Sequence, residues 1–321
     1  MTFEHNLLRR IDFVTLRLFV AVCESGGIGR AAERERIAAS AVSKRLSDLE
    51  TALGAPLLQR HARGVRPSAA GQSVLHHARG VLHGLQRMQN ELGEFAHGVR
   101  GHVRIHATIS AILQFLPGDL GAFARQHESV KIDLEEHISA DVLRALQEGV
   151  ADIGICAAAA ATAPAQPAAS GGSGGLVSLP YRSDALVLVA PRNHPLAAHK
   201  QIFFAQALEH DIVGLHNQSS IGAALHQAAA RSGKALRQRI QVRGLDAMCR
   251  MIDNGLGIGV LPDGAFALLQ GLGNLTAIAL ADDWARRDLR LVARDFDTLP
   301  AAAKLLVAHL RRAESICPQP A

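Results

Sequence analysis

The sequence predicts a multidomain α+β protein with an amino-terminal helix-turn-helix and β-hairpin, a long linker helix, and a carboxy-terminal α/β region. Three observations predict it. Three short helical stretches occupy the first 54 residues, and residues 69–99 contain no proline and carry apolar side chains at helical spacing. From residue 102, short strand patterns alternate with helical ones. At 321 residues the chain has room for two or three domains.

The first domain is expected over residues 10–68. Residues 15–23 fit an amphipathic helix that stops at Gly26 and Gly27, and helical pattern returns at 30–36 and 40–53. The side chains that can bury one side of the last two helices are Ala31, Ala32, Ile37, Val42, Leu46 and Leu49. The opposite side carries Ser40, Ser43, Lys44, Arg45 and Ser47. In a helix-turn-helix, the second helix with such a polar face enters the major groove of DNA.

Basic residues follow this helix pair. Arg60, Arg63 and Arg66 surround Gly64 in a predicted hairpin wing, where they suit phosphates and a narrow minor groove. Residues 1–100 hold 14 Lys+Arg against 9 Asp+Glu, whereas the remainder holds 20 of each. A localised basic excess is typical of a nucleic-acid-binding module, although a solvated basic surface without a partner is the alternative.

Residues 69–99 are predicted to form one long helix with an apolar stripe, which ends in Leu92 and Phe95. A stripe of that length outside a globular core usually pairs with a second copy, so a homodimer is expected. The helix also carries His76, His77 and His83, which we expect to be solvated and to bind no metal.

An α/β region is predicted over residues 100–315. Strands are expected at 103–107, 131–135 and 152–156, with helices at 111–126 and 140–149, which together indicate a mostly parallel sheet. The alanine- and glycine-rich stretch at 157–175 is expected to be a surface loop. A second α/β unit is predicted from the elements at 185–190, 211–215, 221–232, 238–242 and 248–262.

Composition and motifs exclude several classes of protein. No run of about 18 uncharged apolar residues could span a membrane, and residues 1–10 do not resemble an export signal, so the cytoplasm is expected. The four cysteines form no CxxC pair, which argues against a disulfide framework or a zinc site. GxSxG and HExxH are absent, and the glycines of 253–262 precede a predicted strand, as at a helix stop. We therefore expect no enzyme, catalytic residue, cofactor or metal.

Three blocks resemble the LysR-type transcriptional regulators. Residues 16–71 follow the family's amino-terminal signature in order and spacing, residues 101–155 are similar to the start of its effector domain, and DNGLGIGVLP stands at 253–262. The resemblance implies a winged helix-turn-helix, a dimerising linker helix at 69–99, and a two-lobed sensor like a type II periplasmic solute-binding protein. Lobe I would comprise 102–177 and 276–315, and lobe II 178–275.

The sequence departs from the family pattern where the recognition helix begins. Glu35 and Arg36 replace a leucine and a more neutral residue, and Ala38 and Ala39 replace a common Ser-Gln pair. Ala39 then offers only an apolar contact, and specificity shifts to Ser40, Ser43 and Lys44. Lys44 matches the family's basic base-contacting position. The expected DNA-binding residues are Arg34, Ala39, Ser40, Ser43, Lys44, Arg45, Ser47, Arg60, Arg63 and Arg66.

A ligand in such an α/β fold binds beyond the carboxyl ends of strands, where helix amino termini offer free N–H groups. Residues 108–110 follow the first strand and open a helix, and residues 217–220 follow the strand at 211–215 and open another. In the family, these two segments face each other across the interlobe cleft. Their hydroxyls also suit simple helix caps. The expected effector-binding residues are Thr108, Ser110, Asn217, Ser219, Ser220 and Asp246. A carboxylate suits two helix amino termini, whereas Asp246 would disfavour a second negative charge.

These observations predict a sequence-specific DNA-binding transcriptional regulator controlled by a small-molecule effector. Its expected partners are double-stranded DNA with an interrupted inverted repeat, the effector, and a second copy bound through the linker helix. The resemblance also implies a tetramer and contact with RNA polymerase. The alternatives are a ligand-binding protein without DNA activity, which leaves the basic amino terminus unexplained, and a non-specific DNA-binding protein, which leaves the sensor unexplained.

Overall fold

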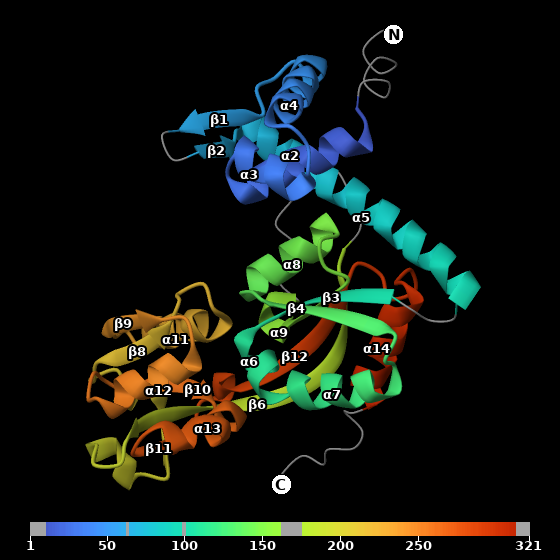
Figure 1. Ribbon diagram of the computed structural model, residues 1–321. Helices are drawn as coiled ribbons and strands as arrows, with labels where there is room; N and C mark the ends of the chain where they lie inside the picture. The colour runs from blue at the N-terminus through green and yellow to red at the C-terminus, as the bar shows by residue number, and fades with distance from the viewer. Residues whose placement is uncertain (1–10, 62–63, 98–100, 162–174, 313–321) are drawn as a thin grey trace. The chain divides into compact units, whose positions relative to one another are not determined.

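The computed structural model describes residues 11–61, 64–97, 101–161 and 175–312 (Figure 1). The chain folds into two compact units, of which the first ends near residue 96 and the second is the α/β region. The first unit contains α2 (Phe13–Ser25), α3 (Ile28–Glu35), α4 (Ala39–Leu53), β1 (Leu58–His61), β2 (Gly64–Pro67) and α5 (Ala69–His97). This order is the predicted winged helix-turn-helix followed by the predicted linker helix.

A small apolar core holds the first unit together. Leu18, Phe19 and Val22 of α2 are fully buried, and they pack in one cluster with residues of α3 and α4 that include Ala31 and Val42. Asp12 caps α2, because its carboxylate accepts hydrogen bonds from the amide and the hydroxyl of Thr15. The apolar positions recognised in the sequence therefore set the crossing of the three helices.

The hairpin wing is fastened to the turn between α2 and α3. The amide of Val65 donates to the carbonyl of Gly26 at 3.0 Å. Gly64 has a φ of 132°, and a Cβ at this position would lie only 2.2 Å from the same carbonyl oxygen. Glu50 of α4 holds the other strand, since its carboxylate accepts from the amides of Leu57 and Leu58. The wing is thus tied to α4, and only glycine fits at its tip.

The linker helix α5 presents apolar side chains to the surface. Val81 is 45% exposed and Met88 is 53% exposed, as expected for a stripe with no core beneath it. Leu92 and Phe95 belong to the part of α5 whose side chains lie outside the description. The expectation that His83 is solvated is wrong, because this residue is only 7% exposed.

The second unit has two lobes. Lobe I is a sheet of order β4-β3-β5-β12-β6, in which β3 pairs in parallel with β4 and β5. The strands are β3 (Gly101–Ala107), β4 (Val130–Glu136), β5 (Ile153–Ala157), β12 (Arg286–Ala293) and the first half of β6 (Val177–Pro191). Its helices are α6 (Ile109–Gln114), α7 (Leu116–Gln126), α8 (Ser139–Glu148), α9 (Ala158–Ala161) and α14 (Ala301–Arg312).

Two sequence expectations for lobe I need comment. The single helix expected at 111–126 is divided at Phe115, just before Pro117 in the first turn of α7. Most of the surface loop expected at 157–175 lies outside the described residues, and α9 occupies its first positions.

Lobe II is built on the second half of β6, which pairs with β10 and β11. Its strands are β7 (Gln201–Ile202), β8 (Ile212–Leu215), β9 (Gln238–Val242), β10 (Gly259–Pro262) and β11 (Leu275–Leu280). Its helices are α10 (Phe204–Ala207), α11 (Ser220–Arg231), α12 (Leu245–Asp253) and α13 (Asp263–Leu269), with short 3-10 turns η1 (Pro195–Ala198), η2 (Gln270–Leu272) and η3 (Asp283–Ala285). Gly255 and Gly257 lie between α12 and β10, as the helix-stop interpretation of 253–262 predicts.

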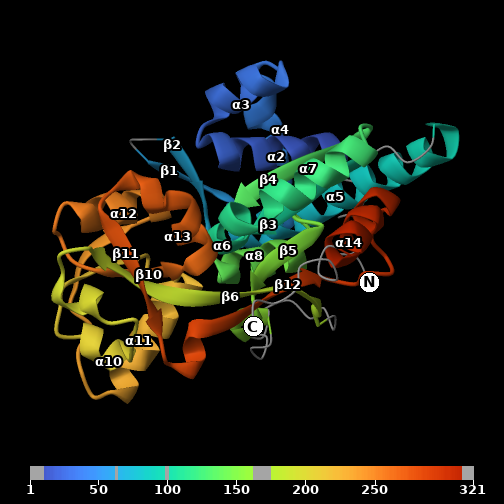
Figure 2. The ribbon, with the colours of Figure 1, turned by 90° about the horizontal axis from the view of Figure 1, so that it is seen from below.

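A single long strand joins the lobes. β6 runs from lobe I to lobe II, and the returning chain enters lobe I through β12 (Figure 2). The partner of β6 changes at one point, where Ala185 pairs with Arg286 of β12 and Leu186 pairs with Pro262 of β10. Only the second half of β6 was expected as a strand. No helix among the described residues is long and apolar enough to span a bilayer.

Candidate functional site

The amino-terminal half of α4 carries an exposed polar face. Ala39, Ser40, Lys44 and Ser47 are exposed, and Ser43 is partly buried beside the core residue Val42. Ala38 precedes the helix in an extended conformation and offers no side-chain cap. Within the described part of the chain, the ammonium group of Lys44 makes no ion pair. This side chain is therefore available to a partner outside the protein.

Two of the predicted DNA-binding arginines are engaged inside the first unit. The guanidinium of Arg45 donates to Asp12 at 2.9 Å and to the Thr15 hydroxyl at 3.1 Å. Arg34 pairs with Glu24 at 3.1 Å. Arg45 thus ties α4 to the start of α2, and both side chains remain about half exposed.

The wing presents part of its predicted basic set. Arg66 is exposed on β2, and Arg60 lies on β1 opposite Val65, although its side chain is outside the description. Arg63 is one of the residues that the structure does not describe. The helix α4 and the hairpin β1–β2 therefore form one candidate DNA-binding surface on the first unit.

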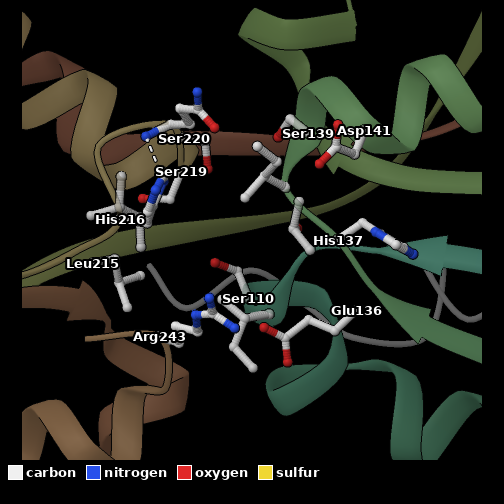
Figure 3. A pocket seen from close by; sticks show the side chains of 15 residues that line it. Ser110, Glu136, His137, Ser139, Asp141, Leu215, His216, Ser219, Ser220 and Arg243 are labelled. Atoms are coloured by element: carbon white, nitrogen blue, oxygen red, sulfur yellow. Dashed lines mark hydrogen bonds between the residues drawn. The ribbon is translucent and has the colours of Figure 1, made fainter. Parts of the chain in front are cut away.

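The second unit has a cleft of about 350 Å³ between its lobes (Figure 3). Lobe I contributes the loops after β3 and β4, and lobe II contributes the loops after β8 and β9, so three helix amino termini, those of α6, α8 and α11, surround the cleft. The lining residues are Thr108, Ile109, Ser110, Glu136, His137, Ile138, Ser139, Asp141, Leu215, His216, Gln218, Ser219, Ser220, Ile221 and Arg243.

Hydroxyl groups in the cleft differ in what they already bind. The Thr108 and Ser139 hydroxyls are buried and have no hydrogen-bond partner among the residues that the structure describes. By contrast, the Ser219 hydroxyl accepts from the amide of Gly222 at 3.0 Å and thereby caps α11. Because a buried polar atom without a partner is costly, Thr108 and Ser139 are suited to bind a polar ligand. The Ser219 hydroxyl accepts a hydrogen bond as a helix cap, and its own proton remains available to a ligand.

The charges of the cleft are divided between its walls. Glu136 and Asp141 belong to lobe I, whereas Arg243 follows β9 in lobe II and is exposed (Figure 3). Helix amino termini add partial positive charge next to the hydroxyl groups. The cleft can therefore bind one anionic group at its cationic side, together with hydrogen-bond donors of the same ligand at its acidic side.

Of the predicted effector residues, Thr108, Ser110, Ser219 and Ser220 line the cleft, whereas Asn217 and Asp246 do not. The Asn217 side chain accepts from the Gln241 amide at 2.7 Å on the outer surface of lobe II. Asp246 lies in the first turn of α12 and is exposed there. Glu136 and Asp141, and not Asp246, are the carboxylates that line the cleft and would repel a negatively charged ligand group there. Neither these carboxylates nor Arg243 stands in a recognisable motif.

A buried ion pair connects the cleft with the point where β6 changes partners. Arg287 of β12 contacts Asp184 of β6 through two nitrogens, and its Nε lies 2.8 Å from Asp184 Oδ1. The same guanidinium donates to the Ser110 hydroxyl at 3.2 Å, and Gln114 donates to Asp184 at 3.0 Å. Asp184 and Arg287 side chains are only 1% and 8% exposed. Ser110 therefore links the cleft directly to the interlobe strands.

The comparisons with known proteins agree with both units. The chain is 25% identical over 246 residues to the RuBisCO operon transcriptional regulator of Allochromatium vinosum, which covers 77% of this chain and 78% of the relative. The fold of the LysR family regulator CbnR matches with a TM-score of 0.70 and 20% identity, covering 95% of this chain and 99% of CbnR. CbnR has also been solved with its target DNA. The effector domain of QuiR, solved with shikimate, matches 67% of this chain and 98% of its own at a TM-score of 0.56 and 16% identity.

A winged helix-turn-helix joined to a two-lobed domain with a cleft defines a DNA-binding transcriptional regulator with an effector domain. The model of the bacterial regulatory helix-turn-helix protein, lysR family, matches residues 13–72, and that of the LysR substrate binding domain matches 96–315. The chain therefore belongs to the LysR family of transcriptional regulators. It is a regulator and not an enzyme.

Proposed function

We propose that the effector is a small monocarboxylate that also carries hydroxyl or amino groups. The observation that carries this proposal is the pair of buried hydroxyls of Thr108 and Ser139, which have no partner in the described part of the chain and belong to residues that line the cleft near helix amino termini. A carboxylate would accept hydrogen bonds from such hydroxyls, and the guanidinium of Arg243 would supply the counter-charge.

The acidic wall favours one carboxylate over two. Glu136 and Asp141 would repel a second anionic group, whereas they accept hydrogen bonds from ligand hydroxyl or amino groups. QuiR supports this class of ligand, because its related effector domain was solved with shikimate, a carboxylate with hydroxyl groups.

Effector binding would act on the chain through Ser110. Its hydroxyl accepts from Arg287, so its own proton is available to a ligand. A ligand that engages Ser110 and Ser219 together holds lobe I and lobe II at one angle. Such a ligand shifts the lobe equilibrium only by its difference in affinity for the open and closed forms.

We further propose that the protein binds an interrupted inverted repeat as a dimer. Ala39, Ser40, Ser43, Lys44 and Ser47 of α4 would contact base edges, and Arg66 with the other wing arginines would contact phosphates. The exposed Val81 and Met88 on α5 support pairing of this helix with a second copy. A tetramer, contact with RNA polymerase and a cytoplasmic location fit a regulator of this kind.

A ligand screen on the effector cleft tests the proposed class. Thermal unfolding of the full chain is followed with hydroxy monocarboxylates, matched dicarboxylates and the uncharged amides. We expect the monocarboxylates to raise the melting temperature, and Arg243→Gln to abolish that increase. Arg239→Gln is the matched control, because Arg239 is exposed on β9, four residues before Arg243, and pairs with Asp211, which does not line the cleft. Stabilisation by amides equal to that by acids would refute the carboxylate assignment.

A further inference from the structure

A histidine-carboxylate cluster lies where β3 and β4 end. Glu135 Oε2 lies 2.9 Å from His137 Nε2 and 3.7 Å from His106 Nε2. One potential ligand atom of each residue lies within 4.8 Å of the others. The two imidazole rings stack with centroids 4.3 Å apart. Two histidines and one carboxylate therefore converge on a small volume.

The sheet positions these residues. His106 and Glu135 are direct partners in the parallel register of β3 and β4. His137 follows two residues after Glu135, and its amide donates to the carbonyl of Ala107 at 3.0 Å. That bond extends the pairing past the end of β4 and places the three residues on neighbouring backbone positions.

His106 is buried without satisfying both of its ring nitrogens. Its side chain is 6% exposed, and its Nδ1 has no hydrogen-bond partner within the described ranges. The 3.7 Å separation between Nε2 and Glu135 exceeds a hydrogen bond. The buried ring therefore lies beside Glu135 without a hydrogen bond to it.

We propose that His106, Glu135 and His137 bind a divalent late transition metal ion of the zinc class. Tetrahedral zinc with bonds of 2.0–2.1 Å to nitrogen and oxygen separates its ligand atoms by about 3.3 Å. The observed separations of 2.9 and 3.7 Å lie on both sides of this value. The His137 and Glu135 side chains are 32% and 63% exposed, so they are free to turn their lone pairs toward the ion.

Three protein ligands leave one tetrahedral position for water or an anion. The carboxylate of Glu135 supplies a negative charge that attracts a cation. His137 also lines the effector cleft (Figure 3), whereas His106 and Glu135 do not. Zinc binding at this cluster does not depend on which effector the cleft binds. The zinc experiment can therefore fail or succeed independently of the ligand screen.

The test uses the untagged full-length protein after treatment with EDTA. Zinc binding is measured by competition with a chromophoric chelator, and Co²⁺ is used as a second probe because its d–d absorption reports the ligand geometry. We expect one zinc ion per chain bound at this site. Glu135→Gln and His137→Gln should each lower its affinity by at least about tenfold.

The matched control is His102→Gln. His102 Nε2 lies 2.6 Å from Asp133 Oδ2 on the same two strands, a histidine-carboxylate pair without a third ligand. The proposal predicts that this variant binds zinc like the wild type. It is overturned if the wild-type protein binds no zinc, if His137→Gln leaves affinity unchanged, or if His102→Gln reduces affinity as much as His137→Gln. Circular dichroism establishes that each variant is folded.

Discussion

Removing the Asp184 carboxylate should destabilise the second unit strongly. Asp184→Asn keeps the shape of the side chain but leaves the guanidinium of Arg287 buried without its counter-charge. Asp184 receives two nitrogens of Arg287 and the amide of Gln114, and the ion-pair partners are 1% and 8% exposed. Breaking a buried pair from one side costs about 3–5 kcal/mol of the free energy of unfolding. We expect a loss in that range.

Urea unfolding measured by tryptophan fluorescence provides the assay, because Trp284 is the only tryptophan and packs against the lobe II core. Glu209→Gln is the control, since the Lys234–Glu209 pair is 45% and 71% exposed and should contribute no more than about 1 kcal/mol. A double variant, Asp184→Leu with Arg287→Met, removes both charges and should recover most of the loss. A loss below about 1 kcal/mol for Asp184→Asn would refute the role of this pair.

Three further predictions concern the wing, the recognition helix and a buried thiol. Gly64→Ala places a Cβ 2.2 Å from the carbonyl oxygen of Gly26, so we expect weaker DNA binding in gel-shift titrations; unchanged affinity would show that the wing tolerates displacement. Lys44→Ala should reduce the preference for the operator over random DNA by about 1–3 kcal/mol, whereas Arg66→Ala should weaken both and lower the salt slope by about 1. Equal losses for operator and random DNA with Lys44→Ala would contradict its base contact. Burial raises the pKa of Cys156 to about 12, so this thiol should react with Ellman's reagent at pH 8 only after unfolding; rapid labelling of native Cys156, located by mass spectrometry, would contradict this.

The helix-turn-helix and the parallel sheet were predictable because their signals are local. The apolar residues of α2 to α4 recur at helical spacing, and the glycines that end α2 and α4 adopt left-handed conformations, at φ of 64° and 67°. Strands β3, β4 and β5 are short segments that carry apolar residues at alternate positions and are separated by helices. In each case, one stretch of sequence contains enough information to specify the element.

The first half of β6 could not be predicted in the same way. Arg182, Ser183 and Asp184 resemble a polar loop, yet they continue a strand because β12 supplies both its backbone partner and a counter-charge. Asp184 and Arg287 are 103 residues apart, so no local window contains the pair. The buried charge of Asp184 can therefore be explained only when β6 and β12 are known to be paired.

The effector cleft contains residues that the local sequence predicts and residues that it does not. Thr108 and Ser219 are foreseeable because each follows a strand and occupies the N-cap position of a helix, and the topology brings such positions to one edge. Arg243 follows β9 as a lone exposed arginine, with nothing in its neighbours to single it out. The topology thus predicts where a ligand binds, whereas the charges that select the ligand depend on which loops meet there.

The histidine-carboxylate cluster extends the same reasoning. The sequence did not single out this cluster, because His106 and Glu135 are 29 positions apart. A parallel register makes those two direct neighbours, and the Glu-x-His spacing at 135–137 adds a third group at the end of the strand. A useful signal was therefore present: a strand that ends in Glu-x-His beside a strand that ends in His. It becomes specific only when the register of β3 against β4 is known, since a shift of one residue would turn His106 to the opposite face of the sheet from Glu135.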